Sequence, residues 1–269
     1  DGAVYTARIK VPSEKMGKVY FCFNEMGQMQ DGLQYIAEED GFYYFDENGY
    51  PVDGKVADVE CDDDSYAFRF ETKNGHNGKG INGEKDNYVY FNGKRLEADD
   101  DYKFYAIKED VYLVNNKGKI QKSKSGKTYD DIENGYFEGK DVRVTTNNSG
   151  VVTKIEVLKD DKSVDETITA NELLAKQILA VTSDKVVSSD TDVEKVLGNA
   201  LYKAEGEYGD DYVAVPFIQL YDDDVYTYLY KVEKSTDKKG NATVKATYDS
   251  SSWLGLNNKD SVFAPAPTK

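Results

Sequence analysis

Large apolar residues, most of them aromatic, recur at a nearly constant spacing through the N-terminal half of this chain. The anchors Phe23, Phe45, Phe68, Phe91 and Val114 follow one another at intervals of 22, 23, 23 and 23 residues. A fixed period of about 20 to 50 residues is the signature of repeat architectures, in which each short unit buries its apolar face against the next one. The spacing therefore restricts this half of the chain to an array of small, similar units.

Each unit has the composition of a β-hairpin. Tyr43–Phe45 and Tyr88–Phe91 are runs of β-prone aromatic residues, and Asn48 with Gly49 forms a strong two-residue turn signal, because both tolerate positive φ. Asn or Asp follows four of the five anchors, and a glycine lies four residues after three of them (Asn24, Asp46, Asn92 and Asn115; Gly27, Gly49 and Gly118). Since one hairpin is marginal in water, we predict a β-hairpin repeat solenoid over residues 1–155. The alternative is an ordinary β-meander with evenly spaced strands.

The regularity differs between the units. Gly75 and Gly93 fall outside the register of the other turn glycines, so the third and fourth units are degenerate. A sixth, looser unit is predicted over Val142–Val152, with its turn at Asn148–Gly150.

The hydrophobic pattern changes near Glu156. Thr169–Glu172 and Thr191–Glu194 match the capping box, in which a hydroxyl and a carboxylate satisfy free backbone donors, and each precedes apolar residues at helical spacing. Alternating residues then predict strands over Tyr212–Leu220, Tyr226–Val232 and Val244–Tyr248, with Pro216 at an edge or a bulge. We predict a small α+β domain over residues 156–269, so that the whole chain is mainly β. The alternative is that Tyr228–Val244 is another hairpin and the solenoid continues.

The composition excludes several classes of protein. The formal net charge is −16, whereas phosphate contacts need clustered Lys and Arg, so we expect no nucleic-acid partner. The 22 Tyr, 11 Phe and single Trp are too many for a disordered acidic tail. The longest apolar run, about Tyr212–Tyr221, is shorter than the roughly 18 residues that a membrane-spanning helix needs, so we expect no membrane-spanning segment.

The repeat residues resemble a known family. Phe42–Gly49 (FYYFDENG) and Tyr112–Ile120 (YLVNNKGKI) are similar to the cell-wall-binding repeats of Gram-positive bacteria, which include choline-binding and glucan-binding modules. The resemblance covers about residues 17–155. Choline-binding repeats usually open with Gly-Trp, whereas the only tryptophan here, Trp253, lies outside the repeats.

The resemblance implies an extracellular or cell-surface protein that binds cell-wall polysaccharide or glycan through aromatic side chains. A chain that begins at Asp1 without a leader fits a mature exported protein or an excised fragment. We expect ligand stacking on six tyrosines: Tyr43, Tyr44, Tyr66, Tyr88, Tyr90 and Tyr112. The net charge favours a cationic ligand over a polyphosphate polymer; a neutral glycan, a surface protein as partner, or no ligand stay open. We expect no cofactor, no metal and no catalysis.

Several motifs have ordinary structural explanations. Gly78–Gly83 matches GxGxxG but lies in a Gly- and Asn-rich stretch without helical period, so a loop is predicted. His76 is the only histidine and lies in the same stretch. The acidic triplets at Asp62–Asp64, Asp99–Asp101 and Asp222–Asp224 each precede an aromatic strand, which favours turn chemistry over calcium. Cys22 and Cys61 are either a disulfide or two buried thiols.

Two other functions remain open. The repeats are a structural spacer or a protein-interaction module if their aromatic side chains prove buried. The chain is an enzyme of the glycoside hydrolase type if a cleft holds two facing carboxyl groups about 5 to 10 Å apart.

Overall fold

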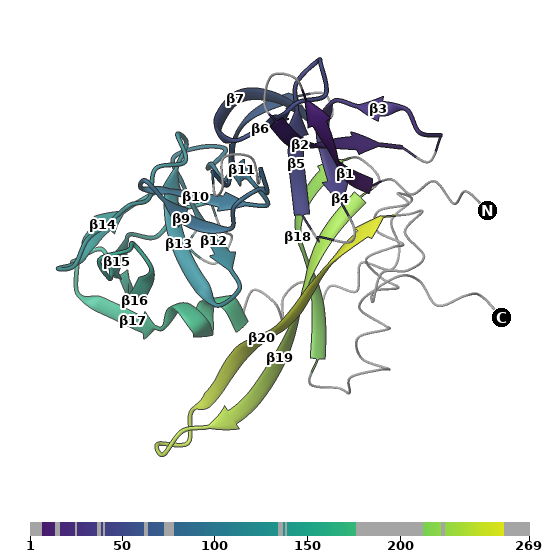
Figure 1. Ribbon diagram of the computed structural model, residues 1–269. Helices are drawn as coiled ribbons and strands as arrows, with labels where there is room; N and C mark the ends of the chain where they lie inside the picture. The colour runs from purple at the N-terminus through teal and green to yellow at the C-terminus, as the bar shows by residue number, and fades with distance from the viewer. Residues whose placement is uncertain are drawn as a thin grey trace. The chain divides into compact units, whose positions relative to one another are not determined.

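The computed structural model describes residues 7–13, 17–24, 26–36, 39, 41–61, 64–72, 78–133, 137, 139–175, 212–221 and 224–255. The chain is mainly β, as the sequence predicts, and its strands form six antiparallel sheets among the described residues (Figure 1). The chain divides into two compact units, Asp1–Glu97 and Ala98–Lys269. The division predicted at residue 155 stays a prediction, although one strand runs across that position, from Val152 to Leu158.

Three sheets make up the first unit. Their strands are ordered β1-β2-β3, β4-β5-β6 and β7-β8-β11-β10-β9. The strands are β1 (Ala7–Ser13), β2 (Gly17–Phe23), β3 (Met29–Gln30), β4 (Gly32–Ile36), β5 (Gly41–Phe45), β6 (Pro51–Val52), β7 (Gly54–Cys61), β8 (Asp64–Phe70), β9 (Gly83–Lys85), β10 (Tyr88–Phe91) and β11 (Lys94–Arg95).

The second unit also contains three sheets among the described residues. They are ordered β12-β13, β14-β15-β16-β17 and β18-β19-β20. The strands are β12 (Tyr102–Ile107), β13 (Asp110–Asn115), β14 (Lys127–Tyr129), β15 (Val142–Thr146), β16 (Val152–Leu158), β17 (Val164–Ile168), β18 (Tyr212–Tyr221), β19 (Asp224–Thr236) and β20 (Ala242–Gly255).

One turn geometry recurs at five hairpins. In the β5–β6 turn, the Asp46 N–H donates to the Tyr50 carbonyl (2.9 Å), and the Gly49 N–H donates to the Asp46 carbonyl (2.8 Å). Asp46 Oδ1 also accepts the N–H groups of Asn48 (2.9 Å) and Tyr50 (2.8 Å). The same pattern of bonds begins at four other residues: Asn24, Asn115, Asn147 and Asp237. We call this arrangement the Asx-Gly turn.

The Asx-Gly turn corrects one detail of the sequence prediction and confirms another. Asn48 and Gly49 do not form a two-residue turn; the loop has three residues, and the positive φ falls on Gly49 (74°). The Asp46 side chain stabilises this longer loop by accepting two backbone donors, which a two-residue turn would not present. The sixth unit has its three-residue turn at Asn148–Gly150, as predicted, closed by the Asn147 N–H that donates to the Val151 carbonyl (2.9 Å).

The two turns on either side of the fourth anchor strand differ from the Asx-Gly turn, whereas Gly75 of the third unit lies outside the described residues. β9 and β10 are joined by Asp86 and Asn87, both at positive φ (54° and 67°), and β10 and β11 by Asn92 and Gly93 (47° and 92°). Positive φ at both central residues defines the two-residue type I′ hairpin. The register shift seen in the sequence therefore reflects a shorter turn placed directly after the Phe91 anchor.

Two pairs of successive hairpins pack through the same contacts, and the first pair lies in the N-terminal unit. β2–β3 and β5–β6 form a pair that we call the first stack. The Met29 side chain lies over Gly49, where an added Cβ would be 2.4 Å from the Met29 Sδ atom. The rings of Phe21 and Tyr50 are 5.3 Å apart.

The same contacts recur in the second unit. β13 with residues 116–121, and β15–β16, form what we call the second stack. Ile120 lies over Gly150, where an added Cβ would be 2.5 Å from the Ile120 Cγ2 atom, and Tyr112 pairs with Val151. In both stacks, the residue five positions after the turn Asn or Asp covers the turn glycine of the next hairpin. This shared step supports the prediction of stacked hairpins.

Four of the five anchor residues lie in the core. Phe45, Phe68, Phe91 and Val114 are at most 1% exposed, and Phe23 is half-buried. They divide between local clusters: Phe45 packs with Cys22, Ile36 and Tyr43, whereas Phe68 packs with Val59 and Phe70. The period therefore supplies one core residue to each of four of the five units.

The first capping box predicted in the C-terminal half is present. The Glu172 N–H donates to Thr169 Oγ1 (3.1 Å), and the Thr169 N–H donates to Glu172 Oε2 (2.7 Å), at the start of a helix over residues 170–175. The Asn171 side chain ties this helix to β20, because it donates to the Ala246 carbonyl (2.8 Å) and accepts the Ala246 N–H (3.0 Å). The second predicted helix, at Thr191, lies outside the described residues.

The three predicted C-terminal strands are confirmed as β18, β19 and β20. Pro216 lies on the edge strand β18, where the register shifts between Pro216 and Ile218, as the missing N–H of proline requires. The β19–β20 hairpin has the Asx-Gly turn of the repeats but belongs to a sheet of much longer strands. Among the described residues, no helix has the length and apolar character needed to span a bilayer.

Candidate functional site

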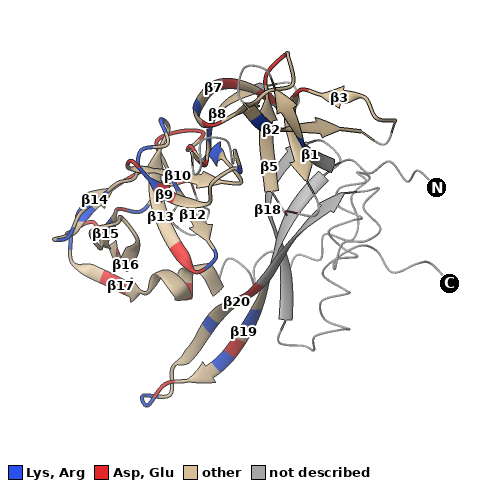
Figure 2. Cartoon of the chain, in the orientation of Figure 1, with Lys and Arg blue, Asp and Glu red and all other residues tan. Residues whose placement is uncertain are grey.

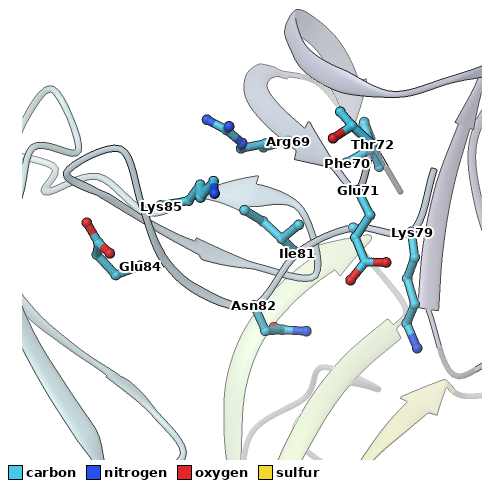
Figure 3. A pocket seen from close by; sticks show the side chains of 10 residues that line it. Arg69, Phe70, Glu71, Thr72, Lys79, Ile81, Asn82, Glu84 and Lys85 are labelled. Carbon is cyan, nitrogen blue, oxygen red and sulfur yellow. The ribbon is translucent and has the colours of Figure 1, made fainter. Parts of the chain in front are cut away.

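A pocket of about 530 Å³ lies in the first unit, beside β8 and the segment that leads into β9. Figure 3 shows polar and charged side chains around it, together with Phe70 and Ile81. Its lining consists of Arg69, Phe70, Glu71, Thr72, Lys79, Gly80, Ile81, Asn82, Glu84 and Lys85.

Backbone pairing positions the wall that precedes β9. The Glu71 N–H donates to the Lys79 carbonyl (2.7 Å), and the Ile81 N–H donates to the Arg69 carbonyl (3.1 Å). Gly80 donates to the Phe42 carbonyl (2.7 Å), which joins this wall to β5. These bonds hold the segment against β8 and keep one side of the pocket fixed.

Gly80 is required by a close approach of two backbones. A Cβ atom at Gly80 would lie 2.4 Å from the Asn92 carbonyl oxygen and 2.8 Å from the Gly93 nitrogen, distances that no side chain can occupy. The GxGxxG match at Gly78–Gly83 is thus a packing feature. Strand β9, and not a helix, begins at Gly83, so the geometry of a dinucleotide fingerprint is absent at this motif.

An ion pair lies beside the pocket wall. The Arg69 Nη1 atom is 2.5 Å from Asp86 Oδ2, and Lys55 lies 3.7 Å from the same oxygen. The Arg69 hydrogen bond lowers the pKa of the Asp86 carboxyl below its ordinary value. Partial burial would lower the pKa of Arg69, but hydrogen bonds to Asp86 and Tyr90 raise it overall. Arg69 therefore stays charged and is held in one orientation.

Two further lining residues are fixed by hydrogen bonds. Lys79 Nζ donates to the Glu39 carbonyl (2.6 Å). The Asn82 side chain accepts the Asn92 N–H (2.9 Å) and donates to Asn92 Oδ1 (3.1 Å), while the buried Asn92 Nδ2 has no partner. The pocket therefore combines oriented donors with acceptors on rigid backbone.

The mixture of groups determines which ligand class fits. Arg69, Lys79 and Lys85 supply donors, and Glu71 and Glu84 supply acceptors. A sugar hydroxyl both donates and accepts hydrogen bonds, so it needs both kinds of group in one place. Apolar surface beside a few oriented polar groups is typical of small-molecule sites.

Three of the six predicted tyrosines are buried. Tyr43, Tyr90 and Tyr112 are 2%, 3% and 4% exposed, so their rings are packed within the protein. Tyr112 belongs to the second unit, whereas the other five belong to the first. Whether any of the six binds a ligand stays a prediction.

The other three tyrosines are half-buried: Tyr66 and Tyr88 lie on strands β8 and β10 of the sheet beside the pocket, and Tyr44 lies on β5. Tyr44 stacks on Phe70, which lines the pocket, with ring centroids 6.2 Å apart and planes 19° apart. Lys94 Nζ lies 3.5 Å from the centroid of Tyr66, and the Arg95 guanidinium lies 5.3 Å from that of Tyr88. The faces of Tyr66 and Tyr88 thus already contact cations of the protein itself.

Sequence reasoning missed the polar residues of the pocket. Arg69 belongs to no motif, and Lys79 and Asn82 occupy variable positions of the GxGxxG match; the three meet only because β8 pairs with the segment before β9. The glycines at 78 and 80 are the one local signal, because closely spaced glycines mark a close backbone approach.

The remaining predicted motifs show no assembled site among the described residues. No cluster of three or more His, Cys, Asp or Glu side chains suited to a metal occurs in the described part of the chain. Asp99 pairs with Lys103 (2.7 Å) at the start of β12, in line with turn chemistry. His76, Asp62, Asp63, Asp222 and Asp223 lie outside the described residues, and Cys22 is buried. Because the side chain of Cys61 is not described, the disulfide stays a prediction.

Comparison with solved structures found distant similarities. Choline-binding protein F from Streptococcus pneumoniae, in complex with ipratropium, is 14% identical with a TM-score of 0.33, over 57% of this chain and 44% of that one. The autolysin LytC from Streptococcus pneumoniae is 9% identical with a TM-score of 0.31, over 63% of this chain and 46% of that one. An alternansucrase in complex with isomaltononaose is 17% identical with a TM-score of 0.21, over 54% of this chain and 12% of that one.

The chain spans less than half the length of these three structures. At such identities and TM-scores the similarities carry no argument about this chain. A scan against protein-family models and a search of curated proteins both found no match.

Proposed function

We propose that this chain is a non-catalytic binding module, secreted or surface-attached, that holds a cell-wall polysaccharide or glycan. The single observation that carries the proposal is the pocket beside β8, in which donors and acceptors surround Phe70 and Ile81. The resemblance of the repeat residues to cell-wall-binding repeats supports the same ligand class.

In this proposal the ligand contacts the pocket together with the half-buried tyrosines, of which Tyr44 stacks on the lining residue Phe70. One saccharide residue would place its hydroxyl groups between Glu71 and Lys85, since both side chains are accessible. Neighbouring residues of the polymer would contact the exposed edges of Tyr44, Tyr66 and Tyr88. Tyr43, Tyr90 and Tyr112 act as core residues in this proposal, because they are buried.

The test is retention of the full chain on insoluble wall polysaccharide and glucan. Glu71→Gln with Lys85→Gln replaces one charged acceptor and one charged donor by neutral amides without a change in net charge. We expect retention to fall about tenfold, since hydrogen bonds to charged groups are the stronger ones. The matched control, Glu47→Gln with Lys18→Gln, changes two exposed residues of the same unit and should leave retention intact. Equal retention of the two double variants, or no retention of the unaltered chain, would refute the proposal.

A spacer or protein-interaction module is the second candidate, and the burial of three of the six predicted tyrosines favours it. In that case the repeats act as a rigid support and the pocket has no ligand. The unaltered chain would then bind no glycan but would still show the cooperative unfolding of a packed array.

A further inference from the structure

Positive charge is concentrated in one part of this acidic chain. Residues 111–129 contain five lysines, residues 142–155 contain Arg143 and Lys154, and neither segment contains Asp or Glu. Because these segments carry seven positive charges and the whole chain carries −16, the remaining residues carry −23. Figure 2 shows the basic residues at and beside β14.

The two acid-free segments cover most of the second stack, and the first of them continues through β14. Ile120 and Lys122 both lie over Gly150, within 2.5 Å and 3.1 Å of a Cβ built there. The Ser123 N–H donates to Thr146 Oγ1 (2.9 Å), and the Thr146 N–H donates to the Ser123 carbonyl (2.8 Å). The two segments therefore present one continuous surface, and its charge is not diluted by acidic neighbours within it.

The cationic side chains of this surface face solvent. We call them the basic strip: Lys117, Lys119, Lys122, Lys124 and Lys127, with Arg143 and Lys154. The five lysines are all exposed. Arg143 and Lys154 contact Glu156, at 3.6 Å and 2.9 Å, just beyond the acid-free segment. Lys117, Lys119 and Lys124 make no ion pair with a described acidic residue.

We propose that the basic strip binds a linear polyanion whose charges are phosphate groups. Lysine ammonium groups act as point charges toward phosphate, and a row of them fits a chain of phosphates without fixed geometry. Tyr112 and Tyr129, the two tyrosines of the segments, are 4% and 3% exposed. No ring is thus available for base stacking, which disfavours single-stranded nucleic acid.

The net charge of the chain does not prevent this contact. Salt at physiological strength screens charges beyond about 8 Å, so the strip acts on a bound polymer more strongly than distant acidic residues do. The negative net charge of the chain would argue against a phosphate polymer if the acidic residues were spread evenly along the sequence. They are not, because the two segments of the basic strip contain none. The strip belongs to a different unit from the pocket, so this proposal stands apart from glycan binding.

The test measures binding of end-labelled linear inorganic polyphosphate to the full chain by fluorescence anisotropy. The strip variant carries Lys117→Gln, Lys119→Gln, Lys122→Gln and Lys124→Gln. The matched control carries Lys234→Gln, Lys238→Gln, Lys239→Gln and Lys245→Gln, which removes the same charge from the β19–β20 hairpin. Circular dichroism and thermal unfolding confirm that both variants fold.

We expect the strip variant to bind roughly a hundredfold more weakly at low salt and the control to change by less than about threefold. For the unaltered chain, the logarithm of affinity should fall with the logarithm of salt concentration with a slope of roughly −3, at about −0.7 for each phosphate contacted. The Glu71→Gln and Lys85→Gln variant should bind polyphosphate normally, which separates this result from the glycan test.

Three outcomes would overturn the proposal. The first is that the unaltered chain does not bind polyphosphate. The second is equal loss in both quadruple variants, which would mean that only overall charge matters. The third is tighter binding of single-stranded DNA than of polyphosphate at equal phosphate concentration, which would assign the strip to nucleic acid.

Discussion

The two stacks use the same contacts and carry opposite charge. In each, the residue five positions after the turn Asn or Asp covers the next turn glycine, as Met29 covers Gly49 and Ile120 covers Gly150. Residues 20–38 and 41–54 contain six acidic residues and no basic ones. The equivalent positions in the second half of the comparison, residues 111–129 and 142–155, contain seven basic residues and no acidic ones. The comparison teaches that turn hydrogen bonds and apolar contacts determine how successive hairpins stack. The exposed charged groups do not take part in these contacts, so their charge can vary with the ligand that a stack binds.

The largest predicted difference between the stacks is in the loss of stability when the covered turn glycine, Gly49 or Gly150, is replaced by alanine. Gly150→Ala should destabilise the protein by about 2 to 4 kcal/mol, because the new Cβ meets the stiff, buried Ile120 in addition to the strain of a positive φ. Gly49→Ala should cost less, because the end of the half-exposed Met29 side chain can move. Urea unfolding measures both.

The control for this series is Gly27→Ala. Gly27 also has a positive φ (75°) but nothing lies within 4 Å of its Cβ position, so only the backbone strain of about 1 to 2 kcal/mol remains. Equal losses at Gly27, Gly49 and Gly150 would show that the hairpins do not pack as described.

A smaller effect is expected when the turn side chain is removed. Asn147→Ala in the second stack and Asn24→Ala in the first each leave two backbone N–H groups without their acceptor, which should cost about 1 kcal/mol. Asn24→Asp and Asn147→Asp keep the accepting oxygen and should retain most of the stability, as Asp46 does in its own turn. Thermal unfolding compares the four variants, and a loss in the Asp variants as large as in the Ala variants would contradict this role of the side chain.

The smallest predicted effect depends on pH and concerns the second unit. Burial raises the pKa of Tyr105 and of Tyr129 to about 12, from an ordinary value of 10. Since the folded state holds these protons more tightly, the stabilisation is complete below pH 10 and is lost as the pH rises from 10 to about 12. Tyr129→Phe should flatten the fall in melting temperature over this range, whereas an unchanged slope would argue that Tyr129 ionises as readily folded as unfolded.

Local sequence patterns predicted much of the fold. The anchor period, the Thr169 capping box and the bulge at Pro216 are each set by residues close in sequence, and each is confirmed. The predicted two-residue turn at Asn48 and Gly49 was wrong because the side chain of Asp46, two residues before the expected loop, selects the longer turn.

The candidate site could not be predicted in the same way. The pocket depends on the pairing of β8 with the segment before β9 and on the contact of Gly80 with Phe42, which are distant in sequence. The tyrosines illustrate the same limit. β5 is buried on both faces, so residue alternation does not separate the core ring of Tyr43 from the half-buried ring of Tyr44.

In each stack, the bare backbone at the turn glycine of one hairpin receives the apolar side chain that lies two positions after the turn glycine of the preceding hairpin. A duplicated segment of about 23 residues would contain both the turn glycine and the apolar residue two positions later. It could therefore pack against the hairpin before it and the hairpin after it without further substitutions. Lengthening such a chain by duplication therefore preserves the contact between successive hairpins, while the residues outside this contact can be substituted.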